Sequence, residues 1–172
     1  AALCAGGQGP PSFSPRYIAL TEQYNGSSWT EVANVITGRK HADGAGAENA
    51  ALFIGGCDVA AGALSNKTEH YNGSSWSAGG ALIYAAKNGS HVGAQNSSLY
   101  AGSAVSPYLQ TQEYDGTSWS ESGALSVALS YTAMAGVQNA AITFGGYDAG
   151  YLRYLTEHYN GISWSAGGNL NR

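Results

Sequence analysis

The stretch TEQYNGSSW, residues 21–29, decides the fold because close variants of it recur three more times in the 172-residue chain. The variants are TEHYNGSSW at 68–76, TQEYDGTSW at 111–119 and TEHYNGISW at 156–164. Each copy places Asn-Gly or Asp-Gly between two short runs of residues. This dipeptide is a strong signal for a tight β-hairpin, since both central residues of a type I′ turn need positive φ. Each copy therefore predicts one hairpin with a type I′ turn.

The spacing between two sequence anchors separates a rigid segment from a variable one. The first anchor is the tryptophan, and successive tryptophans are 47, 43 and 45 residues apart. The second is a run ending in glycine or serine: ALCAGG at 2–7, ALFIGG at 51–56, SLYAGS at 98–103 and AITFGG at 141–146. From each tryptophan to the second residue of the next run the step is always 23 residues, whereas from the end of a run to the next tryptophan it varies from 16 to 22. Constant length indicates packed strands and tight turns, and variable length indicates a surface loop.

Each repeat is predicted to form four short antiparallel strands, named A to D. Strand A is exemplified by residues 89–94 and 131–136, strand B is the apolar run, strand C is the Thr-Glu-His-Tyr segment and strand D contains the tryptophan. Repeats of about 40–50 residues with four strands have the size of β-propeller blades. The predicted fold class is therefore all-β, a propeller of four blades that form a whole ring or part of a larger one. The chain is interpreted as one domain, residues 1–172, with repeats at about 1–44, 45–91, 92–134 and 135–172.

The residues that the repeats share are predicted to be structural. A blade cannot bury both of its faces alone, so the recurring tryptophans and tyrosines are expected to pack between neighbouring blades rather than to form a row of exposed stacking platforms. Glutamates recur at one position beside the tyrosine, as Glu22, Glu69 and Glu157. General acid–base catalysis needs two carboxyl groups in one cleft. A glutamate on each blade is expected instead to bond with strand or turn backbone.

The repeats resemble kelch repeats, in which a Gly pair follows an apolar strand and a Tyr and a Trp come later. The matching positions are Gly6, Gly7, Tyr24, Asn25 and Trp29; Gly55, Gly56, Tyr71, Asn72 and Trp76; Gly102, Tyr114, Asp115 and Trp119; and Gly145, Gly146, Tyr159, Asn160 and Trp164. Ser103 departs from the second glycine, and the turn between Tyr and Trp is shorter than the usual kelch spacing. The resemblance covers essentially the whole chain. It implies a propeller, and kelch-like propellers are mostly binding scaffolds, with a minority of enzymes such as the relatives of galactose oxidase.

Two further resemblances bear on function. The segment YNGSSWSAGGAL, residues 71–82, is similar to repeats of uncharacterised bacterial and bacteriophage proteins, which favours a surface- or virion-associated adhesive or structural role and an extracellular or virion-associated location. The segment DGTSW, residues 115–119, resembles the Asp-box of sialidase propellers. That box separates its Asp and Gly by one residue, whereas here the two are adjacent and the other three copies carry Asn. A galactose-oxidase-like or sialidase-like enzyme is therefore the alternative to a binding scaffold.

The constant spacing predicts an incomplete first repeat. Strand B after Trp164 is expected at residue 187, or at Leu3 in a closed ring, and the chain ends at Arg172. About 12 residues, one strand A, are then missing. Two explanations stay open: a segment of a longer array, which is favoured because kelch-like rings usually hold more than four blades, or four blades that close with the gap filled by another chain or left empty. Open strand edges invite pairing, so self-association through blade edges is predicted.

Several function classes are disfavoured. A net charge of −4 with only seven Lys and Arg gives no footprint for nucleic acid, and no apolar stretch approaches the roughly 20 residues of a membrane span. His70 and His158 occupy the same repeat position, which places them on separate blades, and no histidine has zinc-site spacing. Cys4 and Cys57 are interpreted as free thiols. No nucleophile elbow, phosphate loop or dinucleotide motif is present, so no catalytic residue, metal or cofactor is predicted.

The variable B–C loops are the predicted binding site. In a four-stranded blade the B–C and D–A connections share one face and the A–B and C–D turns share the other. The loops span residues 8–20, 57–67, 104–110 and 147–155, and Tyr and Arg are enriched at binding hot spots. The alternative is that these aromatic residues pack locally to hold the loops. The candidate ligand-binding residues are Phe13, Arg16, Tyr17, Asp58, Tyr108, Asp148, Tyr151, Arg153 and Tyr154. The expected function is a non-enzymatic scaffold that recognises a protein or glycan through this face.

Overall fold

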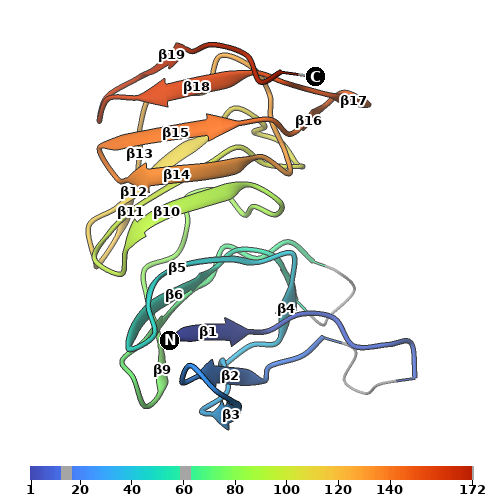
Figure 1. The fold of residues 1–172 in the computed structure, drawn as a ribbon, viewed down its shortest axis with the longest axis vertical. Coiled ribbons are helices and arrows are strands. Elements are labelled where there is room, and N and C mark those ends of the chain that lie inside the picture. The colour runs from blue at the N-terminus through green and yellow to red at the C-terminus, as the bar shows by residue number, and fades with distance from the viewer. Residues whose placement is uncertain (13–16, 59–62, 172) are drawn as a thin grey trace.

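The computed structural model describes residues 1–12, 17–58 and 63–171, and these residues form strands, turns and loops without a helix. Four antiparallel sheets follow one another along the chain and from bottom to top in Figure 1. Sheet 1 contains β1 (Ala2–Ala5), β2 (Thr21–Tyr24) and β3 (Trp29–Val32), and sheet 2 contains β5 (Asp43–Ala47), β6 (Ala50–Ile54), β8 (Thr68–Tyr71) and β9 (Trp76–Ala78). The all-β prediction, with repeated four-stranded antiparallel sheets, is confirmed.

Sheets 3 and 4 repeat the order of sheet 2. Sheet 3 contains β10 (Ser90–Ala94), β11 (Ser97–Ala101), β12 (Thr111–Tyr114) and β13 (Trp119–Glu121), and sheet 4 contains β14 (Ala133–Val137), β15 (Ala140–Phe144), β18 (Thr156–Tyr159) and β19 (Trp164–Ala166). Two short pairs lie in the connections: β4 (Arg39–Lys40) with β7 (Cys57–Asp58), and β16 (Tyr147–Asp148) with β17 (Tyr151–Leu152). Sheet 1 has three strands among the described residues. The strand that it lacks is the equivalent of β5, β10 and β14, as the constant spacing predicts.

The repeated Asn-Gly segments form hairpins, but not with the predicted type I′ turn. Tyr24 pairs with Trp29, and four residues lie between them. Gly26 has a φ of +103°, whereas Asn25 is not among the residues with positive φ. The Asn25 carboxamide instead accepts hydrogen bonds from the backbone N–H groups of Ser27 and Ser28, at 2.8 and 3.0 Å. The asparagine therefore acts through its side chain, and only the glycine needs the left-handed backbone.

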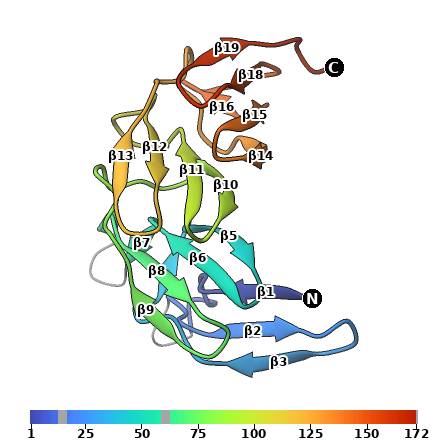
Figure 2. The ribbon, with the colours of Figure 1, turned by 90° about the vertical axis from the view of Figure 1, so that its left-hand side faces the viewer.

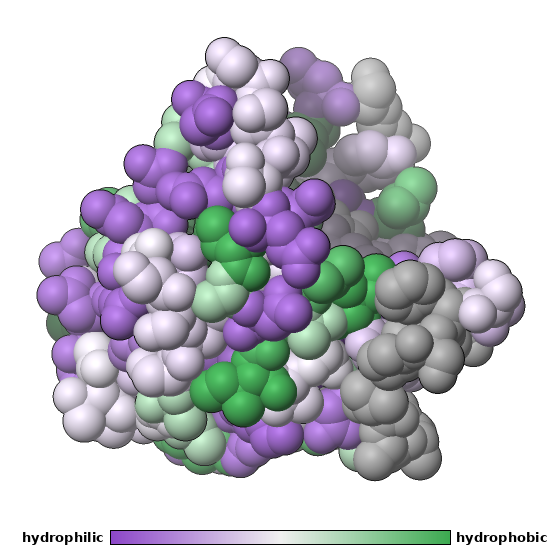
Figure 3. Space-filling view, turned by 90° about the horizontal axis from the view of Figure 1, so that it is seen from below, coloured by the Kyte–Doolittle hydropathy of each residue, from purple (hydrophilic) through white to green (hydrophobic). Residues whose placement is uncertain are grey.

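The sheets are arranged along an open arc. Strand β10 lies beside both β5 and β14, and Figure 2 shows these three strands on the inner side of the arc and β9, β13 and β19 on its outer side. Sheets 1 and 4 lie at opposite ends (Figures 1 and 2). The described residues do not close the arc into a ring. The end formed by sheet 1, seen from below, carries apolar side chains scattered among hydrophilic ones (Figure 3).

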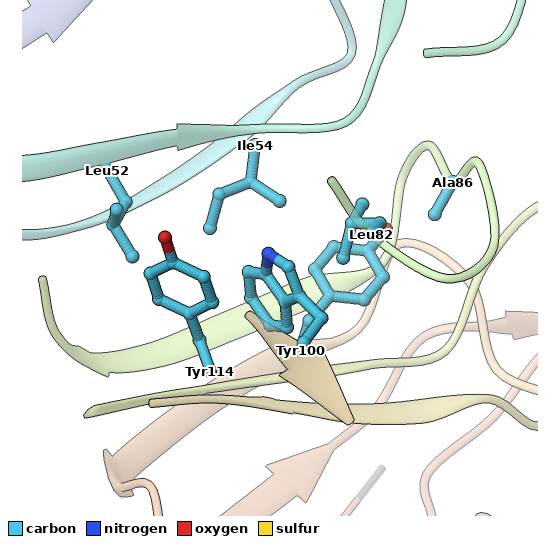
Figure 4. Packing of buried hydrophobic residues seen from close by; sticks show 7 residues of the cluster. Leu52, Ile54, Leu82, Ala86, Tyr100 and Tyr114 are labelled. Carbon is cyan, nitrogen blue, oxygen red and sulfur yellow. The ribbon is translucent and has the colours of Figure 1, made fainter. Parts of the chain in front are cut away.

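The core lies between successive sheets rather than in one central mass. Between sheets 2 and 3, Leu52, Ile54 and Leu82 pack against Tyr100, Tyr114 and Trp119 (Figure 4). Tyr114 is fully buried and lies with its ring centroid 4.8 Å from that of Trp119. Burial of aromatic side chains of this size contributes more to folding than any other single contact in such a layer. The predicted packing of the repeated aromatic residues between neighbouring sheets is confirmed here.

Candidate functional site

The two kinds of connection lie at opposite ends of the strands. The B–C and D–A connections meet at one end, where β4 pairs with β7 and Ser130 exchanges two backbone hydrogen bonds with Tyr147. The A–B and C–D turns meet at the other end, where Gly73, Gly116 and Gly161 each lie against an asparagine of the neighbouring turn. The predicted loop face therefore exists as a continuous feature of the described residues.

The predicted site residues of the first two loops lie within local contacts. Phe13 and Arg16 are outside the described residues. Tyr17 lies in a bridge to Gln8, and the Lys40 ammonium is 4.9 Å from the centre of its ring. Asp58 lies in β7, and one of its carboxylate oxygens is 3.9 Å from the Lys67 ammonium. These side chains are positioned by neighbours of the same two sheets.

The loops of sheets 3 and 4 converge on a pocket of about 420 Å³. It brings together two predicted residues, Tyr108 and Asp148, which are 40 positions apart. The Tyr108 and Tyr147 side chains are 51 % and 41 % exposed, so both rings are accessible from the pocket. The remaining lining residues are small, which leaves the space open: Ser103, Ala104, Ala128, Ser130, Ala149 and Gly150.

A two-residue turn positions the fourth-sheet side of this pocket. Strands β16 and β17 pair Asp148 with Tyr151, and the two central residues, Ala149 and Gly150, have φ of +47° and +97°. Positive φ at both central positions is the geometry that favours tight hairpins. Alanine at positive φ is strained by about 1 kcal/mol. Backbone strain of this kind often marks functional segments, and here it lies in the pocket wall.

An ion pair fixes the carboxylate of the pocket. Arg153 donates from Nη2 and Nε to Oδ2 of Asp148, at 2.6 and 3.1 Å. This leaves Oδ1 outside the ion pair. Arg153 thus orients the carboxylate, while the neighbouring Tyr151 and Leu152 project outward with exposures of 69 % and 73 %. Tyr154, the last predicted residue of the loop, is 38 % exposed.

The arrangement can bind a small polar group with an apolar face. Tyrosine rings offer flat apolar surface, and an oriented carboxylate accepts hydrogen bonds from hydroxyl or amide donors. Pockets with a mostly apolar wall and a few fixed polar groups are typical ligand sites. A sugar ring has both features, and so does a polar side chain of a protein.

Sequence reasoning missed two polar residues of this pocket, Ser103 and Ser130, whereas Tyr147 lies in the predicted loop at 147–155. Ser103 stands where the other runs end in glycine, and this departure from the repeat was a visible signal. It is 1 % exposed, and its hydroxyl accepts a hydrogen bond from the Val105 N–H at 3.1 Å. Ser130 carried no signal, because it lies in a D–A connection that reaches the pocket only through its pairing with Tyr147.

A second group of titratable residues lies on the inner strands β5 and β10 and on the adjacent strand β11. Burial raises the pKa of Asp43 to about 6 and lowers the pKa of His91 to about 4. Burial, and then the charge of Asp43, raises the pKa of Tyr100. Comparison of the repeats does not indicate this group, because the residues equivalent to Asp43 in sheets 3 and 4 are Ser90 and Ala133, which do not titrate. Within the described ranges, no three His, Cys, Asp or Glu side chains form a metal-binding group.

A larger cavity, about 730 Å³, lies beside sheet 1 and has a structural explanation. Its walls are β1 on one side and β5 and β6 on the other, with Trp76 at one end. In sheets 2 to 4 the inner strand occupies the equivalent place beside strand B. The cavity therefore marks the position of the strand that sheet 1 lacks.

No protein-family model matches the chain, and the curated proteins contain no significant match to it. In the described part of the chain, no helix has the length and hydropathy of a membrane span. Cys4 is exposed and Cys57 is buried, and both are free thiols as predicted.

Proposed function

We propose that the chain is a non-enzymatic β-propeller scaffold of four kelch-like blades that binds a protein or glycan ligand through its loop face. One observation carries this proposal: most residues that line the pocket, Tyr108, Tyr147 and Asp148 among them, belong to the segments whose length varies among the repeats. A scaffold that holds variable loops at one end of rigid sheets is a common way to build a binding site. A surface- or virion-associated setting follows from the sequence resemblance alone.

The regular part of each repeat supports the scaffold interpretation. Four successive sheets of the same strand order, with inner strands side by side along an arc, have the arrangement expected of propeller blades. In sheets 2 to 4 the shared Trp and the shared Glu or Gln make contacts with the preceding sheet, so they are not available to a ligand. The four sheets are accordingly treated as four blades, of which the first lacks its inner strand.

The test measures binding by the whole chain to an array of immobilised glycans and, in parallel, to candidate surface proteins. Tyr108→Ala and Tyr147→Ala should each weaken the binding that the native chain shows by about 5- to 30-fold, since truncation of an interface tyrosine is expected to remove about 1–2 kcal/mol. Ile162→Ala is the matched control, because Ile162 is 76 % exposed on a C–D turn at the opposite end of the sheets. Binding that persists in both tyrosine variants contradicts the proposal.

A further inference from the structure

Two contacts between neighbouring sheets recur at all three junctions of the described residues, and a third recurs at two of them. The first is a hydrogen bond from the tryptophan of one sheet to the first threonine of strand C in the preceding sheet. Trp76 donates from Nε1 to Thr21 at 3.1 Å, and Trp119 to Thr68 and Trp164 to Thr111 at 2.9 Å each. Every junction therefore has a tryptophan side and a threonine side.

The second contact joins an acidic or amide side chain to the connection that leaves the preceding sheet. Glu69 accepts from the Ile36 N–H at 2.6 Å, Gln112 from Ile83 at 2.8 Å and Glu157 from Ser126 at 2.9 Å. The expectation that the recurring glutamates bond with backbone is confirmed for Glu69 and Glu157. Because Gln112 makes the same contact, the position requires an acceptor oxygen rather than a charge.

The third contact joins the tyrosine of strand C to a polar side chain of the preceding sheet. The Tyr114 hydroxyl lies 2.6 Å from His70 Nε2, and the Tyr159 hydroxyl donates to Glu113 at 2.6 Å. His70 and Glu113 occupy the same repeat position. At the last two junctions one sheet thus offers Trp, Tyr and an acceptor, and the other offers Thr, a polar side chain and a backbone N–H. At the first junction the Tyr71 hydroxyl is buried without a hydrogen-bond partner among the described residues.

Sheet 1 offers the first set of groups to solvent. Trp29 is 51 % exposed, whereas Trp76 and Trp119 are 8 % and 6 % exposed. Glu22, the equivalent of Glu69, is also exposed, and the Tyr24 hydroxyl donates only to the carbonyl of Gly26 in its own hairpin. Figure 3 shows this end of the molecule, with apolar side chains open to solvent. The tryptophan side of a junction is present here without its threonine side.

Sheet 4 offers the complementary set. Leu170 is 43 % exposed, although its equivalents Val35, Leu82 and Leu125 are at most 3 % exposed. Its N–H donates to the Tyr154 carbonyl at 2.7 Å, as the N–H of Leu82 does to Asn66, so the segment after β19 already follows the path of the interior connections. A Cβ on Gly123 would meet the carbonyl of Ile162 in the next sheet, whereas a Cβ on Gly168 would meet nothing within 4 Å. The threonine side of a junction is therefore preformed, with Leu170 and Gly168 uncovered. Thr156 is 6 % exposed, and its hydroxyl donates to the Gly168 carbonyl at 2.7 Å, which leaves the oxygen lone pairs as the acceptor for an indole N–H.

We propose that sheet 1 of one copy packs on sheet 4 of a second copy, head to tail, in a fourth junction of the same kind. Trp29 then donates to Thr156 of the other copy, Tyr24 lies against His158, and Glu22 accepts from the N–H of Asn171. These are the repeat equivalents of the three contacts above. The association uses the flat faces of the sheets rather than open strand edges, and it is independent of the loop-face function. A second copy is the occupant because one chain carries both complementary faces.

The junction is heterologous, since the two faces differ. Such interfaces generate rings where the rotation closes and open filaments where it does not. Variants in the two faces therefore test it separately. Trp29→Ala removes the tryptophan side, and Leu170→Asp places a charge on the threonine side. Both residues are exposed in the single chain, so both variants should unfold at the same denaturant concentration as the monomeric native chain. Ile162→Ala, on an exposed turn outside the junction, is the control.

The test is the mass of the purified chain over a range of concentrations, by light scattering and sedimentation equilibrium. The native chain and Ile162→Ala should associate, and each face variant should associate at least about 30-fold more weakly, as loss of an interface hot spot predicts. An equimolar mixture of the two variants should form a one-to-one complex and stop there, because it holds one intact junction. Glu22→Gln should retain association, since Gln112 makes the same contact, whereas Glu22→Ala should weaken it.

Three results would overturn the proposal. The first is a native chain that stays monomeric up to about 100 μM, because its self-association would then be weaker than a specific interface requires. The second is a face variant that self-associates like the native chain, which indicates an interface elsewhere. The third is a mixture of the two variants that does not associate. Tyr147→Ala should leave association unchanged, so failure of this proposal and failure of loop-face binding are distinguishable.

Discussion

Glu69→Gln should destabilise the chain far more than the same substitution at Glu157. Both glutamates hold the same repeat position and accept from two backbone N–H groups of the preceding connection. Only Glu69 also accepts from a buried arginine, at 3.0 Å from Arg39 Nη2. The Arg39 side chain is fully buried, and it donates further to the carbonyls of Gly55 and Lys67. Burial lowers the pKa of Arg39, and the Glu69 carboxylate opposes that shift.

The magnitude follows from what each variant leaves behind. Glu69→Gln leaves a buried guanidinium without a counter-ion, which costs about 3–5 kcal/mol. Glu157→Gln keeps one acceptor oxygen for the backbone, as Gln112 does, and costs about 1 kcal/mol. The difference of about 2–4 kcal/mol is attributable to Arg39. For a chain of this length, the full cost of Glu69→Gln lowers the Tm by roughly 6–20 °C.

Urea unfolding of both variants and amide hydrogen exchange in β2 and β3 measure the effect. Because repeated sheets contact mainly their neighbours, loss of Glu69 should release sheet 1 first, and exchange there should rise before the other sheets unfold. The double variant Arg39→Leu with Glu69→Gln should recover most of the stability, since leucine occupies the equivalent position at Leu129. Equal losses in the two single variants, within about 0.5 kcal/mol, would refute this reasoning.

Three other predictions concern the packing and the inner strands. Trp119→Ala should reduce the free energy of unfolding by about 3–5 kcal/mol, because the Trp119 side chain is only 6 % exposed. Trp29→Ala, measured on the monomer, should reduce it by less than about 1 kcal/mol, because Trp29 is 51 % exposed. Chemical denaturation of the two variants measures both losses. Gly93→Ala should destabilise sheet 3 by more than about 2 kcal/mol, since φ is +113° and the new Cβ would clash with the Ser97 carbonyl oxygen; thermal unfolding would show no change if the reasoning fails. The pKa of Asp43 is raised to about 6, so the folded chain keeps this proton longer than the unfolded chain and the free energy of unfolding falls as the pH rises from about 4 to 6. The pKa of His91 is lowered to about 4, so the unfolded chain binds this proton more tightly and the free energy of unfolding rises as the pH rises from about 4 to 6.5. The two trends oppose each other. Because Asp43→Asn removes the falling trend, its stability relative to the native chain should increase by about 3 kcal/mol as the pH rises from about 4 to 6; urea titrations of both chains at a series of pH values measure this difference, and a difference that does not change with pH would contradict it.

The repeated part of the fold was predictable because the same hairpin sequence and the same apolar run recur four times in the sequence. A constant step of 23 residues predicts one repeated path from strand D to the next strand B, although that path includes the D–A connection, for example between β9 and β10. An Asn-Gly between two short runs predicts a hairpin whatever its turn type. The type I′ prediction was wrong because Asn25 accepts hydrogen bonds from the two following N–H groups through its side chain. A left-handed backbone at the asparagine is then unnecessary.

The non-repeated contacts were not predictable in this way. Arg39 occupies the position of Ala86 and Leu129, and nothing in the surrounding residues indicates that an arginine is buried there. Its partner is 30 residues away in the next sheet. The pocket likewise depends on which loops meet in space. Tyr108 and Asp148 belong to loops of different length, and only the pairing of Ser130 with Tyr147 brings the two loops together.

The division between shared and unshared residues also limits where a ligand can bind. The indole N–H of Trp119, the carboxylate of Glu157 and the carboxamide of Asn72 are all occupied by contacts within or between sheets. A ligand could reach these groups only by replacing hydrogen bonds that hold neighbouring sheets together, each of which contributes about 1 kcal/mol to stability. The rings of Tyr108 and Tyr147 carry no such role and are accessible. Sequence change in the loops can therefore alter recognition without loss of the fold, whereas change in the hairpins alters the fold first.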